Sequence, residues 1–262
     1  MLESRRIFIT GGSSGIGLAC AKLAMQYGAK VTLMARSEEK LAAAQEELGD
    51  GCWIYAGDVT SADDVEKAVA FAIESMDGLD GAVNCAGSAS VGNIYELDDE
   101  AFESTLKVCL YGVMYATRAE TAYMVENDIR GSIVNVSSLN STVPYRMYTP
   151  YDAAKGGVDM LTRTASLELG PLGIRINAVC PGFTVTPLTS AFLDMPEVMK
   201  EIRSHTPLRR WGTSEEIAEV VCFMLSDKAS YVTGVCLQVD GGMQNTAYPD
   251  IWRIVYEEDD DD

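Results

Sequence analysis

Residues 5–17 read RRIFITGGSSGIG, an apolar run followed by a glycine-rich turn. The run is typical of a buried β-strand, and the segment after it, LACAKLAMQYG (18–28), is typical of a helix. Gly11, Gly15 and Gly17 therefore fall at a strand-to-helix turn. Because these residues carry no side chain, an anionic pyrophosphate could reach the amide groups at the helix N-terminus, where the helix dipole favours negative charge. The spacing is G-x-x-x-G-x-G, not the commoner G-x-G-x-x-G.

Strand-like and helix-like segments alternate along the rest of the chain. Such alternation predicts a doubly wound parallel sheet of about seven strands with helices on both faces. The 262 residues are 47% hydrophobic, and no Pro/Gly/Ser-rich linker divides them, so we expect one domain. The segments expected to be strands are RRIFIT (5–10), KVTLMA (30–35), CWIYAG (52–57), LDGAVNCAG (79–87), SIVNVSS (132–138), IRINAVCPG (174–182) and VCLQVDGG (235–242).

Polar residues in the middle of the chain suggest acid/base chemistry. Tyr151 and Lys155 stand four residues apart in TPYDAAKGG (149–157), so a helix would place them on one face. A fixed positive charge beside a phenol favours the phenolate and brings the tyrosine towards the pH range of a useful general acid or base. Ser138 lies upstream and could hydrogen-bond the same substrate oxygen. The three side chains predict proton transfer to and from that oxygen.

Six motifs, in order, resemble the landmarks of the short-chain dehydrogenases/reductases, over about residues 5–243. The resemblance implies a Rossmann-like domain (1–243) with a substrate lid at about 187–210, and a C-terminal extension (244–262) with an acidic tail. It also implies a nicotinamide cofactor and reversible hydride transfer between that cofactor and an alcohol or carbonyl. The motifs are TGGSSGIG (10–17), NCAG (84–87), NVSS (135–138), YDAAK (151–155), PGFTVT (181–186) and VDGG (239–242).

The resemblance also assigns roles to individual residues. Catalysis falls to Ser138, Tyr151 and Lys155. Asp58 and Val59 resemble the family's contact to adenine, whereas Asn84, Ala86 and Gly87 would line the ribose. The full set expected to bind the cofactor is Gly11, Ser13, Ser14, Gly15, Ile16, Gly17, Arg36, Ser37, Asp58, Val59, Asn84, Ala86, Gly87, Tyr151, Lys155, Pro181, Gly182, Thr184 and Thr186.

The end of the second predicted strand bears on the choice between NADP(H) and NAD(H). NAD-binding sites usually place a carboxylate there, against the ribose hydroxyls, but this chain reads MARSEEK (34–40). Arg36 could pair with a 2′-phosphate and Ser37 could add a hydrogen bond, so NADP(H) is favoured over NAD(H). Ser14 weakens this preference, because NADP-preferring relatives often carry a second basic residue at that position.

One position departs from the family pattern. Cys109, in LKVCLYGVM (106–114), stands where the family usually has an Asn that helps to hold a water for proton supply through the lysine. A thiol is a weak donor and a weak acceptor, so it cannot replace the amide. Proton supply could take another route, turnover could be slower, or the protein could be a cofactor-binding relative that catalyses poorly.

The predicted lid favours an apolar substrate. PLTSAFLDMPEVMKEIRSHT (187–206) contains Leu188, Phe192 and several Met residues, which adapt to irregular shapes. A bulky secondary alcohol or ketone, such as a hydroxysteroid, is therefore the first hypothesis. The same segment could instead be an amphipathic helix that packs on the core. Reduction of 3-oxoacyl thioesters, sugar dehydrogenation, and a catalytically weak NADP(H)-binding sensor or structural protein remain as alternatives.

Charge limits the partners that we expect. With 20 Lys and Arg against 39 Asp and Glu, the net charge is −19, which disfavours an acidic carrier protein, nucleic acid and an anionic membrane surface. We expect a small apolar alcohol or ketone as substrate. The resemblance also implies a homo-oligomer, a tetramer or a dimer.

Cysteine and histidine usage suggests that the protein works in a reducing compartment and holds no metal ion. The seven cysteines show no CxxC pair, and the only histidine is His205, so no plausible metal set exists. The chain opens without a charged-then-apolar leader and has no run of about 18 apolar residues. These features favour a cytoplasmic protein.

The end of the chain combines an apolar segment with an acidic run. The apolar part of MQNTAYPDIWRIVY (243–256) should pack on the body or on a neighbouring subunit, and EEDDDD (257–262) should be disordered and solubilise the chain.

Overall fold

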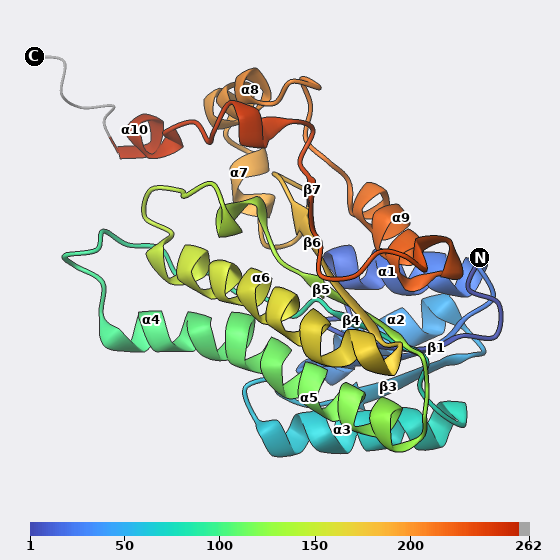
Figure 1. Cartoon of the computed structure of the whole chain (residues 1–262). Coiled ribbons are helices and arrows are strands. Elements are labelled where there is room, and N and C mark those ends of the chain that lie inside the picture. The colour runs from blue at the N-terminus through green and yellow to red at the C-terminus, as the bar shows by residue number, and fades with distance from the viewer. Residues whose placement is uncertain (257–262) are drawn as a thin grey trace, which may run out of the picture.

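The computed structural model describes residues 1–256, and its centre is a parallel sheet. Seven strands within these residues pair in the order β3-β2-β1-β4-β5-β6-β7. Helices lie on both faces of the sheet (Figure 1), which confirms the predicted doubly wound α/β fold. The strands are β1 (Arg6–Thr10), β2 (Lys30–Ala35), β3 (Cys52–Ala56), β4 (Gly81–Asn84), β5 (Ser132–Val136), β6 (Arg175–Pro181) and β7 (Cys236–Val239).

Two hydrophobic layers enclose the sheet. Ile7 and Ile9 of β1 face a layer with α1, α2 and α9, whereas Phe8 between them faces a layer with α3, α5 and the end of α6. This alternation follows from the two-residue period of a strand. The helices are α1 (Gly15–Gln26), α2 (Glu38–Leu48), α3 (Ala62–Met76), α4 (Asp99–Leu106), α5 (Gly112–Glu126), α6 (Thr149–Leu169), α7 (Ser190–Leu193), α8 (Pro196–His205), α9 (Ser214–Leu225) and α10 (Ile251–Tyr256).

Helices α4 and α5 are joined by a π-helical turn over Lys107–Tyr111. The backbone amide of Gly112 bonds to the carbonyl of Lys107, five residues back, instead of four. Single π-turns of this kind often mark functional sites, because they shift the direction of the side chains that they carry. Cys109, the residue that departs from the family pattern, lies in the middle of this turn.

The lid and the C-terminal extension form a third hydrophobic cluster, the lid cluster, beyond the end of the sheet. Figure 1 shows α7, α8 and α10 together at this end, and α8 contacts α10. The extension therefore packs on the body of its own chain. The buried members of the lid cluster are Leu139, Val198, Met199, Ile202, Met243, Ile251 and Trp252, and Phe192, Tyr148 and Tyr248 are among the partly buried ones.

The apolar residues of the predicted lid lie in two different environments, some buried and some exposed. Val198 and Met199 of α8 are buried within the lid cluster, so the alternative of an amphipathic helix on the core applies to them. Leu188 precedes α7 and is exposed. The acidic run 257–262 lies outside the described residues.

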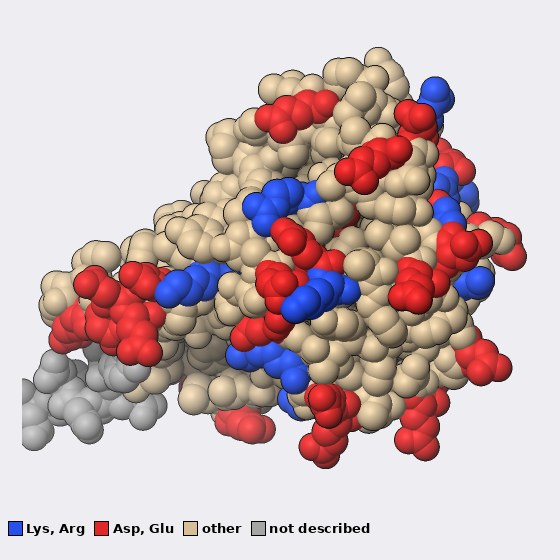
Figure 2. Space-filling model, turned by 90° about the horizontal axis from the view of Figure 1, so that it is seen from below, with Lys and Arg blue, Asp and Glu red and all other residues tan. Residues whose placement is uncertain are grey.

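The described surface carries both signs of charge. Figure 2 shows the side of the molecule on which α3 lies, with acidic side chains predominating and basic ones between them. Helix α3 alone has four carboxylates and one lysine. Some of these charges pair, as Arg118 does with Glu66 at 3.1 Å. No helix within residues 1–256 is long and apolar enough to cross a membrane.

Candidate active site

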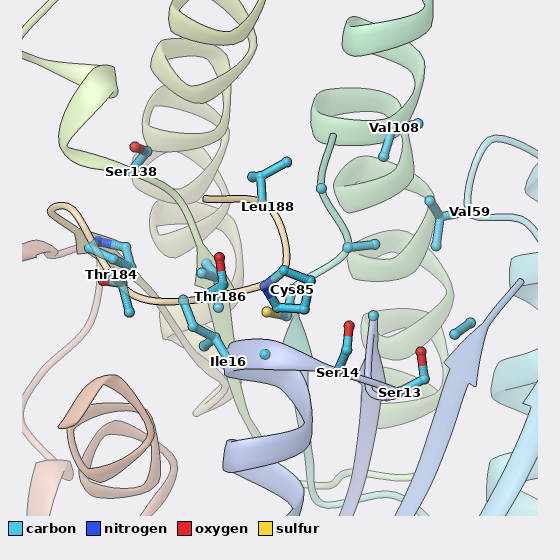
Figure 3. A pocket seen from close by; sticks show the side chains of 18 of the residues that line it. Ser13, Ser14, Ile16, Val59, Cys85, Val108, Ser138, Thr184, Thr186 and Leu188 are labelled. Carbon is cyan, nitrogen blue, oxygen red and sulfur yellow. The ribbon is translucent and has the colours of Figure 1, made fainter. Parts of the chain in front are cut away.

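A cavity of about 790 Å³ opens at the carboxyl ends of the strands, beside the point where the strand order reverses between β1 and β4. This is the place where doubly wound sheets bind ligands. Figure 3 shows Ser13, Ser14 and Ile16 on one side of it and Ser138, Thr184 and Leu188 on others. The predicted site residues that line the cavity are Gly11, Ser13, Ser14, Gly15, Ile16, Arg36, Ser37, Asp58, Val59, Ala86, Gly87, Ser138, Tyr151, Lys155, Pro181, Gly182, Thr184 and Thr186.

The glycine turn brings backbone close to the cavity. Gly11 has φ +67°, and a Cβ placed there would lie 2.8 Å from the amide nitrogen of Ala86, so only glycine fits. Ser14 is the N-cap of α1, but its side chain does not bond to the first-turn amides. Gly87 also lines the cavity, and no atom lies within 4 Å of the point where its Cβ would be, so the space beside it is open. The bare turn and the start of α1 therefore fit a pyrophosphate group.

Two predicted residues do not line the cavity. Gly17 is buried, and a Cβ there would collide with the carbonyl oxygen of Gly11, so this glycine serves the packing of helix against turn. Asn84 is also completely buried, and its side chain turns away from the cavity into the protein. The Asn84 side chain therefore does not reach the cavity in this structure, and the expected place of this residue at a ribose stays a prediction.

Asn84 belongs to a buried polar network behind β4 and β5. Its amide nitrogen lies 3.2 Å from a carboxylate oxygen of Glu120 and 3.1 Å from the side-chain oxygen of Asn135. The amide of Asn135 in turn donates to the Thr162 hydroxyl at 3.0 Å. Burial raises the pKa of Glu120 to about 8, although the Asn84 hydrogen bond acts to lower it. At neutral pH, Glu120 is thus mainly the neutral acid.

The three residues predicted to be catalytic meet in the cavity. Ser138 follows β5 and is the N-cap of a short 3-10 turn, whereas Tyr151 and Lys155 lie one turn apart on α6. The Lys155 ammonium lies 5.5 Å from the centre of the Tyr151 ring and donates to the carbonyl oxygen of Val136 at 2.7 Å. Lys155 and Ser138 are buried. This geometry fixes the amine beneath the phenol.

Electrostatics at the phenol differ from the expectation. Burial raises the pKa of Tyr151 above its ordinary value, while the charge of Lys155 and the hydrogen bond with Ser138 act to lower it. Burial outweighs both, so the net direction is upward and not towards neutrality. For Lys155, burial acts to lower the pKa, but Tyr151 and Cys109 act against burial and leave it raised. The resting site therefore holds a neutral phenol and a charged amine.

A region of positive charge lies at the end of β2. Arg36 and Lys40 both line the cavity, and Ser37 between them caps α2 by accepting from the Lys40 amide at 3.3 Å. Among residues 1–256 neither Arg36 nor Lys40 has an acidic partner, so both charges are available to an anion. Sequence reasoning missed Lys40. Its position in the first turn of the helix that begins just after Arg36 is the signal that could have found it.

Other residues, outside the set expected to bind the cofactor, complete the walls. Cys85 lies between the glycine turn and Lys155, and burial raises the pKa of its thiol to about 11, so it remains protonated. Leu188 follows the β6 loop, which Thr189 holds by donating to the carbonyl of Thr184 at 2.7 Å. The additional lining residues are Ala35, Lys40, Gly57, Cys85, Val108, Val136, Ser137, Pro187, Leu188 and Thr189.

Known proteins resemble this chain over nearly its whole length. The family model described as enoyl-(acyl carrier protein) reductase matches residues 11–244. Glucose 1-dehydrogenase of Gluconobacter oxydans (strain 621H) is 40% identical over 250 residues, which are 94% of this chain and 93% of that protein.

Solved structures share the fold closely. A short-chain type dehydrogenase/reductase from Mycobacterium ulcerans is 34% identical and superposes with a TM-score of 0.93, covering 97% of this chain and 94% of its own. A 3-ketoacyl-(acyl-carrier-protein) reductase from Brucella melitensis, solved in complex with NADH, is 31% identical with a TM-score of 0.88, covering 93% of this chain and 100% of its own.

Proposed function

The chain belongs to the short-chain dehydrogenase/reductase family, and we propose that it is an NAD(P)-dependent alcohol dehydrogenase or ketoreductase that prefers NADP(H) and acts on a bulky apolar secondary alcohol or its ketone. A bound nicotinamide supplies the hydride acceptor or donor. The residues of this chain supply the acid/base chemistry. The single observation that carries the proposal is the meeting of Tyr151 with the buried Ser138 and Lys155 beside a cavity large enough for a dinucleotide.

The proposed proton transfer follows from the positions of these residues. Tyr151 gives its hydroxyl proton to the oxygen of a ketone during reduction and takes it back from the alcohol during oxidation. Lys155, held by the Val136 carbonyl, stabilises the phenolate that forms. Ser138 donates a hydrogen bond to the same substrate oxygen and fixes its position.

The preference for NADP(H) rests on Arg36 and Lys40. A 2′-phosphate adds negative charge and strong acceptor oxygens, and two available cations beside Ser37 would bind it with charge-assisted hydrogen bonds. In the described structure no carboxylate at the end of β2 lines the cavity to receive ribose hydroxyls instead, because Asp58 is the only acidic residue among the lining side chains and follows β3.

Apolar side chains next to the catalytic group support the substrate class. The Tyr148 ring meets the Tyr151 ring edge-on at 6.2 Å, and Trp252 lies 6.3 Å beyond Tyr148. Leu188 lines the cavity (Figure 3). A hydroxysteroid or a ketone of similar size would bury apolar surface against Leu188 and the partly exposed ring of Tyr148. A sugar is the second candidate, because the Gluconobacter relative is named a glucose dehydrogenase.

Rates of NADPH and NADH oxidation across steroid ketones, sugar lactones and acyl-thioester ketones would test the proposal, together with the reverse reactions of the corresponding alcohols. We expect the highest kcat/KM for NADPH with an apolar ketone, and loss of turnover in Tyr151→Phe. A preference for NADH, or for glucose, would contradict the respective part of the proposal. Cofactor binding without any turnover would instead favour a sensor.

The exposed face of α6 supports the proposal that the protein is a homo-oligomer. Leu167 is 77% exposed and Met160 is 58% exposed, on a helix whose other side packs on the core. Apolar groups of this size are costly to leave in water, and a second copy of the chain would cover them. Light scattering should give a multiple of 28.3 kDa for the wild type and a smaller mass for Leu167→Glu.

A further inference from the structure

The C-terminal extension reaches the active site through Tyr248. Its hydroxyl donates to the side-chain oxygen of Asn140 at 2.9 Å. The Tyr248 ring stacks on the ring of Tyr145 at 4.4 Å between centroids, so the hydroxyl is held in one place. Asn140 lies two residues after Ser138, in the 3-10 turn that Ser138 caps. A residue more than a hundred positions away thus contacts the catalytic serine's neighbour.

The amide of Asn140 has only one orientation that satisfies its neighbours. Its nitrogen donates to a carboxylate oxygen of Asp152 at 2.6 Å, and the other oxygen of Asp152 accepts from the backbone amide of Tyr145 at 2.8 Å. A carboxylate accepts hydrogen bonds and cannot donate them when ionised. The side-chain oxygen of Asn140 must therefore face away from Asp152, towards Ser138 and Tyr248.

Ser138 and Tyr248 share that oxygen. The Ser138 hydroxyl donates to it at 3.2 Å, and the same hydroxyl oxygen accepts from the Asn140 backbone amide at 3.2 Å. When a substrate oxygen arrives, Ser138 must turn its proton from Asn140 to the substrate. This move would leave a buried acceptor without a donor if Asn140 had no second partner, which is unfavourable.

We propose that Asn140 and Tyr248 are positioning residues for Ser138, and that the Tyr248 hydroxyl keeps the Asn140 oxygen hydrogen-bonded while Ser138 donates to the substrate. The inference rests on the proposed role of Ser138. The backbone amide of Asn140 meanwhile continues to donate to the Ser138 oxygen, which makes its proton a better donor. The C-terminal extension would then help to position the catalytic serine, in addition to packing on the lid cluster.

A double-mutant cycle tests the inference, with NADPH and isatin, a flat apolar ketone, as the probe. The variants are Tyr248→Phe, Ser138→Ala and the combination of the two. We expect Tyr248→Phe to lower kcat about tenfold, with the KM for NADPH unchanged, because one hydrogen bond to a buried acceptor is lost. In the Ser138→Ala background the same change should have no further effect, because Tyr248 acts through Ser138.

Two controls separate positioning from structure. Tyr145→Phe keeps the ring that stacks on Tyr248 and removes only its hydroxyl. Within residues 1–256 this hydroxyl makes no described hydrogen bond; the bond of Tyr145 to Asp152 comes from its backbone amide. The kcat and the thermal stability should therefore stay at the wild-type level. Asn140→Ala removes the shared acceptor and should lower kcat at least as much as Tyr248→Phe does, with no further loss when the two are combined.

The outcomes distinguish the two proposals. An unchanged kcat in Tyr248→Phe, or the same fold loss with and without Ser138, would overturn the positioning role while leaving Ser138 catalytic. A wild-type kcat in Ser138→Ala would overturn the proposed role of Ser138 itself, and the positioning role with it.

Discussion

The thiol of Cys109 hydrogen-bonds to both the amide and the carbonyl group of Ser88. Its sulfur lies 3.0 Å from the carbonyl oxygen of Ser88, to which it donates, and 3.3 Å from the amide nitrogen, from which it accepts. The π-turn that carries Cys109 aims the side chain at this segment. The thiol therefore anchors the loop after β4, and its hydrogen-bonding capacity is already used.

Cys109→Asn should raise turnover. The amide offers two donors and an acceptor with two lone pairs, so it can bond to Ser88 and still hold a water for proton supply to Lys155. We expect kcat to rise about twofold to tenfold in the direction that consumes protons, measured from NADPH consumption under saturating ketone. Cys109→Ser is the control, because its hydroxyl is too small to serve both roles. An equal or lower kcat in Cys109→Asn would contradict a limiting proton supply.

The pKa of Tyr151 sets the expected pH dependence. Burial holds this pKa above its ordinary value, so the phenol is protonated at neutral pH and the phenolate fraction grows as the pH rises. Alcohol oxidation requires the phenolate and should therefore accelerate from about pH 6 to about pH 9, whereas ketone reduction uses the phenol and should not. Initial rates in both directions across this range provide the measurement, and an oxidation rate that is flat or falls would contradict the assignment.

Arg36 and Lys40 should each contribute to the choice of cofactor. Replacing either by Ala removes a charge-assisted hydrogen bond to the 2′-phosphate, so kcat/KM for NADPH should fall about tenfold or more. The value for NADH should change little, since NADH has no phosphate there. Lys22→Ala serves as the control, because Lys22 pairs with Glu47 at 2.7 Å on the outside of the fold. Equal losses with both cofactors would contradict a 2′-phosphate site.

The residues that sequence reasoning placed correctly are those governed by local patterns. The apolar run before Gly11 and the four-residue spacing of Tyr151 and Lys155 determine a strand, a turn and a helix face without reference to the rest of the chain. Asn84 could not be oriented in this way. Both faces of a central parallel strand are buried, so alternation along β4 does not reveal which side faces a ligand.

Contacts between residues far apart in the chain could not be predicted from the sequence, for a different reason. Tyr248 meets Asn140 only because the extension crosses the lid cluster, and nothing in MQNTAYPDIWRIVY indicates a partner more than a hundred residues upstream. Lys40 looks like any exposed helical lysine until the ends of β1 and β2 are placed around one cavity.

Glu120→Gln should make the protein more resistant to alkaline pH. Glu120 is buried, with its pKa raised to about 8, so the folded state favours the neutral acid while the unfolded chain ionises near the ordinary value. The stability that neutral Glu120 contributes is complete below that ordinary value and is lost as the pH rises through the folded pKa, at about 1.4 kcal/mol per pH unit. Glutamine keeps the bond from Asn84 and does not ionise.

Urea unfolding of both proteins at acidic and mildly alkaline pH measures this difference. The free energy of unfolding should be similar for the two near pH 5 and higher for Glu120→Gln by a few kcal/mol near pH 8, about the amount that the slope allows. Glu126→Gln, at the exposed end of the same helix α5, should leave the pH dependence of the wild type unchanged. If Glu120→Gln lost stability with pH as steeply as the wild type, the carboxyl would have to be ionised in the folded protein, with its charge compensated by the network around Asn84 and Asn135.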